Sequence, residues 1–184
     1  MTDDLTVRAS GCTRCALSRT RQRVVVGDGH YDAKVVVIGE APGQTEDEGG
    51  RPFIGRSGQL LFRLIEEETG LVRDDCYVTN VVKCRPPQNR TPTPKEIEAC
   101  RPWLDEQIAL LGRTVVLSCG NTATRALLDT DRPIGTLRGQ AFQFGRGALV
   151  PTYHPSAALR GGESVVQAMR QDLQMVARVL RSFT

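Results

Sequence analysis

An uninterrupted apolar run from Lys34 to Gly39 constrains the fold more than any other stretch of the chain. It reads Lys-Val-Val-Val-Ile-Gly, with no alternation of polar and apolar residues after the lysine. Such a run is typical of a strand buried on both faces of a parallel sheet, where helices cover each face. The run therefore favours an α/β fold over a sheet with one solvated face.

Strand-like and helix-like segments alternate along the rest of the chain. Strands are expected at 76–82, at 114–120 and on both sides of the glycines at 145 and 147, and helices at 57–69, at 121–128 and over the amphipathic tail from 165 to 180. A further helix is expected to run to about residue 111. Thr93 and Glu96 give it a capping box, and Pro94 suits its first position. A polar acidic loop is expected from Gln44 to Arg51.

This order of elements predicts a three-layer αβα fold with a central, mostly parallel four-stranded sheet. Residues 1–184 are expected to form a single domain, because no repeat or low-complexity linker interrupts the chain. The hydrophobic fraction of 40% and the charged fraction of 24% exclude wholesale disorder. No apolar run approaches the roughly 20 residues of a membrane span. The first residues lack the apolar stretch of a signal peptide, so we expect a cytoplasmic protein without membrane contact, and a monomer.

Six cysteines in such a compartment indicate ligands or packed thiols rather than disulfides. Cys12 and Cys15 form a CxxC pair in a polar segment with no expected element of its own, Cys84 follows a strand, and Cys100 lies in the capped helix. Four thiolates suit zinc or an iron–sulfur cluster, and the missing second tight pair modestly favours the cluster. The alternative is that the six cysteines are unrelated to one another and bind no common metal or cluster. Structural roles are expected for the other two cysteines, at positions 76 and 119, because both lie in strands.

Five motifs occur in a fixed order: GCTRC (11–15), GEAPGQTEDEGGRPFIGRSGQLL (39–61), TNVVKCRPPQNRTP (79–92), EACRPWL (98–104) and YHPSAALR (153–160). With them the chain resembles the family 4 uracil-DNA glycosylases, which are iron–sulfur members of the uracil-DNA glycosylase superfamily. The resemblance implies a monofunctional enzyme that flips deoxyuridine out of single- or double-stranded DNA. It would hydrolyse the N-glycosidic bond and leave an abasic site.

The resemblance also assigns the cysteines. It implies that Cys12, Cys15, Cys84 and Cys100 hold a 4Fe–4S cluster with a structural role. That cluster would clamp the N-terminal segment and the proline-rich loop to the body of the domain.

Three residues suit the recognition of a flipped uracil. The ring of Phe53 offers a flat wall for stacking, and the Asn80 amide both donates and accepts, which matches the imino N–H and 4-carbonyl of uracil. A donor from His154 at the 2-carbonyl would stabilise the charge that develops as the bond breaks. The alternatives are a core phenylalanine, a strand-end cap and a turn histidine. Since parallel strands end at one edge of a sheet, Asn80 and His154 are expected to meet there.

Other pocket residues are expected around this trio. Glu40 follows the buried strand, so its carboxylate can orient a water or stabilise a cationic sugar. The resemblance implies that the backbone near Ala41 approaches uracil and that Asn89 contributes to activity. Glu46 and Asp47 are secondary candidates in the acidic loop, where solvated carboxylates are the plainer interpretation.

The net charge of +3 is too small to indicate a polyanion-binding surface over the whole protein. Contacts with DNA are therefore expected from local clusters of basic residues. Two basic clusters flank the cysteines: Arg14, Arg19, Arg21 and Arg23, and then Lys83, Arg85 and Arg90. After His154, Ser156 can cap the next helix or contact DNA. By the resemblance, Leu159 would wedge into the base stack, with Arg160 near phosphate.

Two other functions fit parts of this pattern. One is a uracil-DNA binder that becomes covalently trapped through its motif histidine. Relatives of that kind carry a KRRIH-containing insertion and a histidine at the third cysteine position, whereas this chain has Cys84 and no insertion. The other is a four-thiolate zinc module that binds DNA without catalysis. A contact with a replication clamp stays open.

Overall fold

A five-stranded sheet forms the middle layer of the computed structural model, which describes residues 4–183. The strands are β1 (Val35–Gly39), β2 (Cys76–Asn80), β3 (Val115–Cys119), β4 (Phe142–Phe144) and β5 (Gly147–Thr152), in the order β2-β1-β3-β5-β4. Four run parallel, and β4 pairs antiparallel with β5 at one edge. The predicted α/β class with a mostly parallel sheet is confirmed, but the predicted count of four strands is wrong. The strand expected before Gly145 is present as β4, and it joins the same sheet through its antiparallel pairing with β5.

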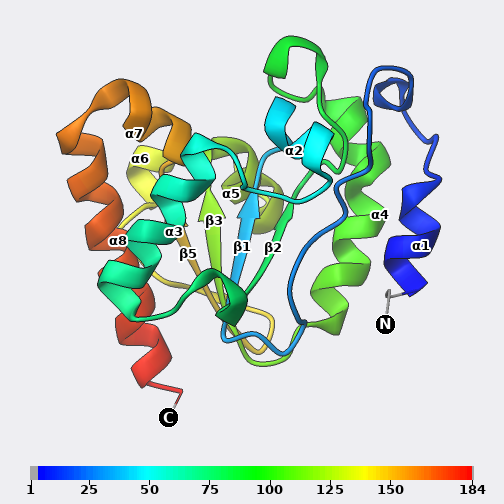
Figure 1. Cartoon of the computed structure of the whole chain (residues 1–184). Helices are drawn as coiled ribbons and strands as arrows, with labels where there is room; N and C mark the ends of the chain where they lie inside the picture. Colours follow the sequence, from blue (N-terminus) through cyan, green and yellow to red (C-terminus); the bar gives the residue numbers. More distant parts are fainter. Residues whose placement is uncertain (1–3, 184) are drawn as a thin grey trace.

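Helices cover both faces of the sheet (Figure 1). They are α1 (Asp4–Ser10), α2 (Gln44–Gly49), α3 (Arg56–Thr69), α4 (Pro94–Leu110), α5 (Gly120–Leu128), α6 (Ile134–Leu137), α7 (Pro155–Gly161) and α8 (Glu163–Arg181), with 3-10 turns η1 (Ala16–Arg19), η2 (Arg73–Asp75) and η3 (Pro87–Asn89). In Figure 1, α3, α7 and α8 lie on one side of the sheet and α1 and α4 on the other. No helix within residues 4–183 is long and apolar enough to cross a membrane.

Alternate residues of β1 explain its unbroken apolar sequence. Val36 and Ile38 pack in one core cluster with Leu104 of α4. Val35 and Val37 belong to a second cluster, with α3 and α8. Because successive side chains of a strand point to opposite faces, a strand between two helical layers must be apolar at every position.

The helix α4 begins as its sequence predicts. The backbone N–H of Glu96 donates to Thr93 Oγ1 (3.3 Å), and the N–H of Thr93 donates to Glu96 Oε2 (2.8 Å). Pro94 occupies the first position, where its missing N–H costs no hydrogen bond. The capping box is therefore confirmed.

Two segments expected to be irregular are helical instead. Gln44–Gly49 forms α2, within the predicted loop, and the N-terminal segment holds α1 and η1 around the first cysteine pair. Elements of four to seven residues span too few turns to show a 3.6-residue period in sequence.

Candidate functional site

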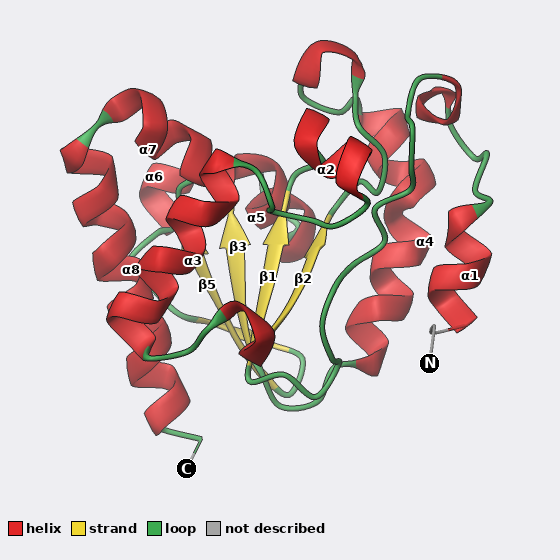
Figure 2. Cartoon of the chain, viewed as in Figure 1, coloured by secondary structure: helices red, strands yellow, loops and turns green. Residues whose placement is uncertain are grey.

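The carboxyl ends of β1, β2, β3 and β5 open on one pocket. Figure 2 shows the arrowheads of β1, β2 and β3 at the same end of the sheet, where α2 lies. The chain passes from β1 outward to β2 and then returns to β3 on the other side of β1. This reversal leaves a crevice where open α/β sheets bind ligands. The pocket there has a volume of about 700 Å³.

Most of the predicted pocket residues line this cavity. They are Glu40, Ala41, Phe53, Asn80, Asn89, His154, Ser156 and Arg160. They come from four separate segments of the sequence, which the parallel sheet brings to one edge. Leu159 and Arg85 are not among the lining residues.

Phe53 and Asn80 approach Gly39 at the end of β1, and His154 lies near Phe53. A Cβ atom on Gly39 would lie 2.5 Å from both Phe53 Cζ and Asn80 Oδ1, so only glycine allows their approach. The ring centroids of Phe53 and His154 are 6.1 Å apart. One pyrimidine can therefore contact all three side chains.

Asn80 is held by its backbone while its side chain stays available. Its carbonyl oxygen accepts a hydrogen bond from Lys83 Nζ (2.6 Å), and the residue is 2% exposed. Within the described part of the chain, its amide has no hydrogen-bond partner. This amide lines the pocket and can both donate to and accept from a bound ligand.

His154 presents a defined tautomer to the pocket. Its Nδ1 accepts a hydrogen bond from the backbone N–H of Ser156 (3.2 Å) and lies 2.8 Å from Ser156 Oγ. A neutral imidazole with an acceptor at Nδ1 carries its proton on Nε2. Ser156 was expected to cap α7, but the structure gives that position to His154, and Ser156 lies in the first turn.

Burial keeps this imidazole neutral. The pKa of His154 is lowered to about 4, mainly by desolvation. The positive charge of Arg160 also lowers this pKa, and the carboxylate of Glu46 raises it by a smaller amount. A neutral donor at Nε2 follows for ordinary solution conditions.

Glu40 is oriented by a residue that sequence reasoning missed. Thr122 Oγ1, in the first turn of α5, donates to Glu40 Oε2 at 2.5 Å. Gly120 makes the turn before it with φ of 89°, and a Cβ there would lie 3.0 Å from His154 Cβ. An isolated threonine carries no sequence signal for such a contact.

Two of the three carboxylates of α2, those of Glu46 and Asp47, are buried, so the solvated loop expected for them is wrong. Glu46 Oε1 accepts from the N–H of Gly55 (2.8 Å), and Oε2 accepts from the N–H of Gly43 (3.2 Å). Asp47, 1% exposed, accepts the N–H groups of residues 22 and 23. Glu46 thus links the backbone at Gly43 to the backbone at Gly55. Asp47 links α2 to the N-terminal segment.

The remaining predicted DNA contacts lie at or near the mouth of the pocket. Leu159 is 47% exposed on α7, and Arg160 follows it on the pocket rim. Arg85 Nε donates to Asn89 Oδ1 (2.7 Å), which places both in the proline-rich loop. Arg90 lines the pocket and pairs with Glu96, whose pKa it lowers to about 2.

Lys83 does not fit its predicted place in a phosphate-binding cluster. It is 1% exposed, and its ammonium donates to Thr79 Oγ1 (2.8 Å), to the Asn80 carbonyl and to Gln107 Oε1 (2.5 Å). A side chain this buried cannot reach DNA. It stabilises the end of β2 instead.

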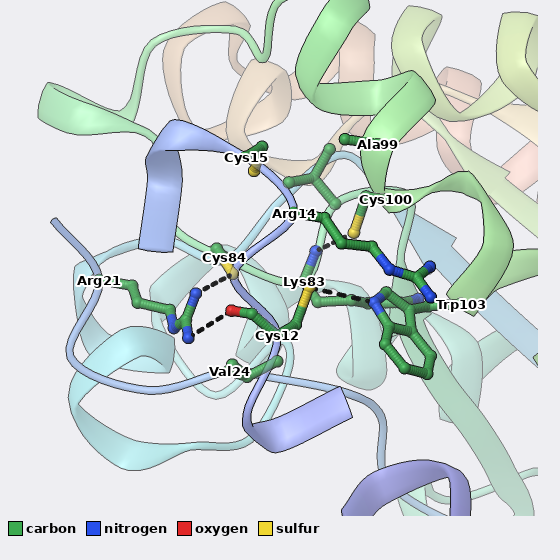
Figure 3. A pocket seen from close by; sticks show the side chains of 11 residues that line it. Cys12, Arg14, Cys15, Arg21, Val24, Lys83, Cys84, Ala99, Cys100 and Trp103 are labelled. Carbon is green, nitrogen blue, oxygen red and sulfur yellow. Dashed lines mark hydrogen bonds between the residues drawn. The ribbon is translucent and has the colours of Figure 1, made fainter. Parts of the chain in front are cut away.

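The four predicted ligand cysteines line a second, small pocket between the N-terminal segment and α4 (Figure 3). Three of their sulfur atoms face N–H donors. Trp103 Nε1 lies 3.3 Å from Cys12 Sγ, the Lys83 N–H lies 3.3 Å from Cys100 Sγ, and Arg21 Nη1 lies 3.5 Å from Cys84 Sγ. Such donors favour thiolates, although burial outweighs Arg21 at Cys84 and raises the pKa of that thiol to about 11.

This donor set fits a group that binds four thiolates. In residues 4–183, no three Cys, His, Asp or Glu side chains converge closely enough to hold a single metal ion. The remaining cysteines lie apart from this pocket, and both are buried. Arg14 is exposed and stacks on the Trp103 ring at 4.4 Å, and Arg21 donates to Cys84 Sγ.

Comparison with known proteins agrees with this geometry. The sequence model described as "Uracil DNA glycosylase superfamily" matches residues 26–177. A type-4 uracil-DNA glycosylase of Thermotoga maritima is 45% identical over 155 residues, covering 83% of this chain and 80% of that protein. The chain belongs to the type-4 uracil-DNA glycosylase family. The type-4 enzyme of Saccharolobus solfataricus is 40% identical over 179 residues, covering 93% of this chain and 82% of its own.

More distant relatives lie within the same superfamily. A type-5 uracil-DNA glycosylase of Thermus thermophilus is 36% identical over 143 residues, covering 70% of this chain and 63% of that protein. Membership of the type-4 uracil-DNA glycosylase family confirms the resemblance drawn from the five motifs.

For this member of the type-4 uracil-DNA glycosylase family, we predict a pH-dependent stability that depends on His154. Its pKa in the folded protein is about 4, whereas an unfolded histidine titrates near 6.5. The unfolded chain therefore binds a proton that the folded chain excludes, and the free energy of unfolding falls as pH drops from about 6.5 to about 4. His154→Gln should flatten this part of the profile.

Nitrogen NMR of the imidazoles checks the same prediction directly. The chain has only two histidines, so His30→Gln assigns both signals. We expect His154 to remain neutral with its proton on Nε2 down to about pH 5. A midpoint near 6.5, or a proton on Nδ1, would contradict the tautomer derived from Ser156.

Proposed function

We propose that this chain is a monofunctional DNA repair glycosylase that flips deoxyuridine out of DNA and hydrolyses its N-glycosidic bond. Family membership supports removal of uracil from DNA. The observation that carries the assignment is the convergence of Phe53, Asn80 and His154 on one pocket. The pocket is completed by a single chain, so a monomer suffices.

Each of the three residues has a separate task in this proposal. Phe53 stacks on the extruded base, and the Asn80 amide donates to the 4-carbonyl oxygen and accepts from the imino N–H. Cytosine presents the reverse pattern and would leave buried polar groups unpaired, at about 1–3 kcal/mol each. His154 donates from Nε2 to the 2-carbonyl oxygen.

The bond that breaks joins N1 of uracil to C1′ of deoxyribose. Its electron pair leaves with the base, and the His154 donor stabilises the anionic charge on the 2-carbonyl oxygen. The Glu40 carboxylate, fixed by Thr122, stabilises the cationic sugar and holds the attacking water. Water adds its hydroxyl to C1′, and its proton neutralises the departing uracil anion. Asn89, at the pocket rim, orders the proline-rich loop over the site.

DNA binding is assigned to the rim of the same pocket. The exposed Leu159 takes the space of the flipped base, which fits its place on α7 beside the opening. Arg160, Arg85 and the Ser156 segment contact the backbone around the lesion. We place this activity inside the cell, where uracil arises in DNA.

We propose further that Cys12, Cys15, Cys84 and Cys100 hold a 4Fe–4S cluster. The four thiols line one pocket, and three of them face N–H donors that favour thiolates. The cluster supplies structural cross-linking, and the thiols tie the N-terminal segment to β2 and α4. A zinc module without catalysis is the less favoured alternative.

Base release from matched oligonucleotides tests the function. We expect the purified protein to release uracil from U·G and U·A pairs or from single strands and to leave an alkali-sensitive site. A shifted band that persists on a denaturing gel would instead indicate covalent trapping. Intact DNA without either product would refute the glycosylase assignment.

A further inference from the structure

The loop that carries Phe53 has an unusual backbone. Phe53 has a φ of 53°, in the left-handed region that a bulky aromatic residue rarely adopts. A conformation of this kind is unfavourable and persists only where the surroundings fix it. The ring of Phe53 can lie flat in the pocket only if something holds this loop.

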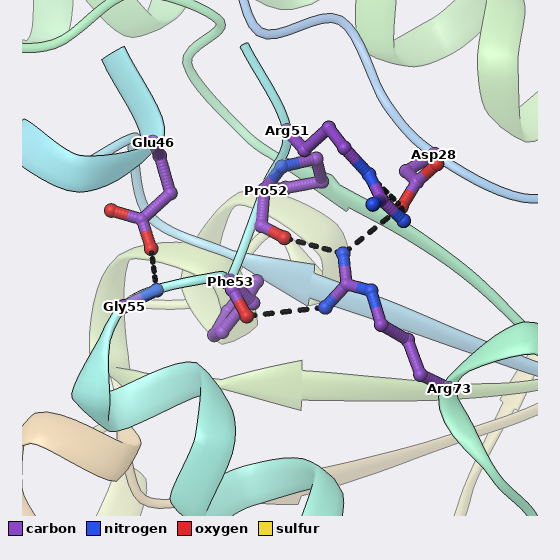
Figure 4. Close-up of polar contacts among 7 residues, drawn as sticks. All are labelled: Asp28, Glu46, Arg51, Pro52, Phe53, Gly55 and Arg73. Carbon is purple, nitrogen blue, oxygen red and sulfur yellow. Dashed lines mark hydrogen bonds and ion pairs between the residues drawn. The ribbon is translucent and has the colours of Figure 1, made fainter. Parts of the chain in front are cut away.

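Arg73, which begins η2 just before β2, contacts the backbone of this loop (Figure 4). Its Nη1 donates to the Phe53 carbonyl (3.1 Å), and its Nη2 donates to the Pro52 carbonyl (2.6 Å). The guanidinium also stacks on the ring of Phe62 at 4.6 Å. Two successive carbonyls on one planar group fix the orientation of the peptide between them.

Asp28 holds Arg73 in place and is itself attached to the sheet. Arg73 Nη2 lies 3.1 Å from Asp28 Oδ2, and the Asp28 backbone exchanges two hydrogen bonds with Val78 of β2 (2.8 and 2.9 Å). Burial alone would raise the pKa of Asp28, but the hydrogen bonds from Arg51 and Arg73 hold it below its ordinary value. The carboxylate thus stays charged at neutral pH.

The opposite side of the loop is closed as well. Gly55 donates its N–H to Glu46, and a Cβ on Gly58 would lie 1.9 Å from the Phe53 carbonyl oxygen. The Phe53 backbone therefore lies between α3 and the Arg73 guanidinium, with no space for another peptide orientation.

We propose that Arg73, anchored by Asp28, is a positioning residue that sets the Phe53 ring for stacking on uracil. This inference rests on the proposed function, because it assigns Phe53 as the stacking wall. Arg73 itself does not line the pocket and touches the base only through Phe53.

A double-mutant cycle tests the inference with the full-length holoprotein. Arg73→Gln should weaken inhibition by free uracil about 10-fold and lower kcat/KM for uracil-DNA by up to about 100-fold, as misplacement by an ångström does elsewhere. In the Phe53→Ala background, the same change should cost less than about 3-fold, since the group it positions is gone. Additive losses in the two backgrounds would overturn the proposal.

Controls separate positioning from general damage. Arg51→Gln removes the other arginine that pairs with Asp28 but touches no Phe53 carbonyl, so it should change uracil inhibition less than about 3-fold. If Arg73→Gln does not fold, Arg73→Lys serves in the same cycle. It keeps the charge but cannot bridge both carbonyls and the carboxylate, and it should give an intermediate loss. Absence of uracil release by the unmodified protein would refute the proposed function, whereas release with additive losses refutes only the role of Arg73.

Discussion

Replacing His154 with alanine is expected to lower kcat for uracil release by about 100- to 1000-fold, the usual cost of one preorganised donor to a developing anion. The structure gives the reason, because Ser156 fixes the ring with Nε2–H as the available donor. KM should change little, since the interaction strengthens only as the bond breaks. Single-turnover rates on a uracil-containing oligonucleotide measure the loss.

Two comparisons define what this result means. His30→Ala removes the other histidine, which is exposed and lies outside the pocket, and should leave the rate unchanged. Asn80→Ala should also cause a large loss in the rate of uracil release. It should weaken inhibition by free uracil as well, because the amide forms hydrogen bonds with the base already in the ground state. Equal losses for His30→Ala and His154→Ala would refute the assigned roles.

If the proposed cluster is bound, replacing Cys100 with serine is expected to abolish its visible absorption and to lower the melting temperature of the protein by about 10–20 °C. Losing about 5 kcal/mol of metal-linked folding energy shifts a domain of this size by about 2–4 °C per kcal/mol. The physical cause is the loss of the cross-link between α4 and the N-terminal segment, which lines the same pocket through Cys12 and Cys15. Visible absorption, iron analysis and thermal melting measure the effect.

Cys76→Ser is the matched control for this experiment. Cys76 is buried like Cys84 and Cys100, but its thiol donates to the Val72 carbonyl and lies outside the thiol pocket. We expect it to keep the full absorption. Stoichiometric zinc without iron in the unmodified protein would contradict the cluster proposal.

The fold was predictable where burial or helix capping requires particular residue types at several neighbouring positions of the sequence. β1 is apolar at every position because helices cover both of its faces, and the start of α4 is encoded by Thr93, Pro94 and Glu96. The short helix α2 was misjudged, because its form depends on contacts with distant segments. Asp47, for example, is buried by residues 22 and 23, which no local period reveals.

The pocket was predictable to the extent that its residues end strands or sit in motifs. Asn80 and His154 follow this rule, and the parallel sheet brings them together. Thr122 and Arg73 were missed because each acts on another residue, Glu40 or Phe53, across a long sequence separation. Lys83 was misassigned because a lysine in a basic cluster normally faces solvent. Its burial follows only from three acceptors that the fold gathers around it.

A crystal structure of the protein soaked with free uracil tests most directly whether one nucleobase is held by three side chains. The ring should stack on Phe53, with its 4-carbonyl and imino edge at the Asn80 amide and its 2-carbonyl oxygen within hydrogen-bond distance of His154 Nε2. Uracil bound elsewhere, or touching only one of these residues, would contradict the account.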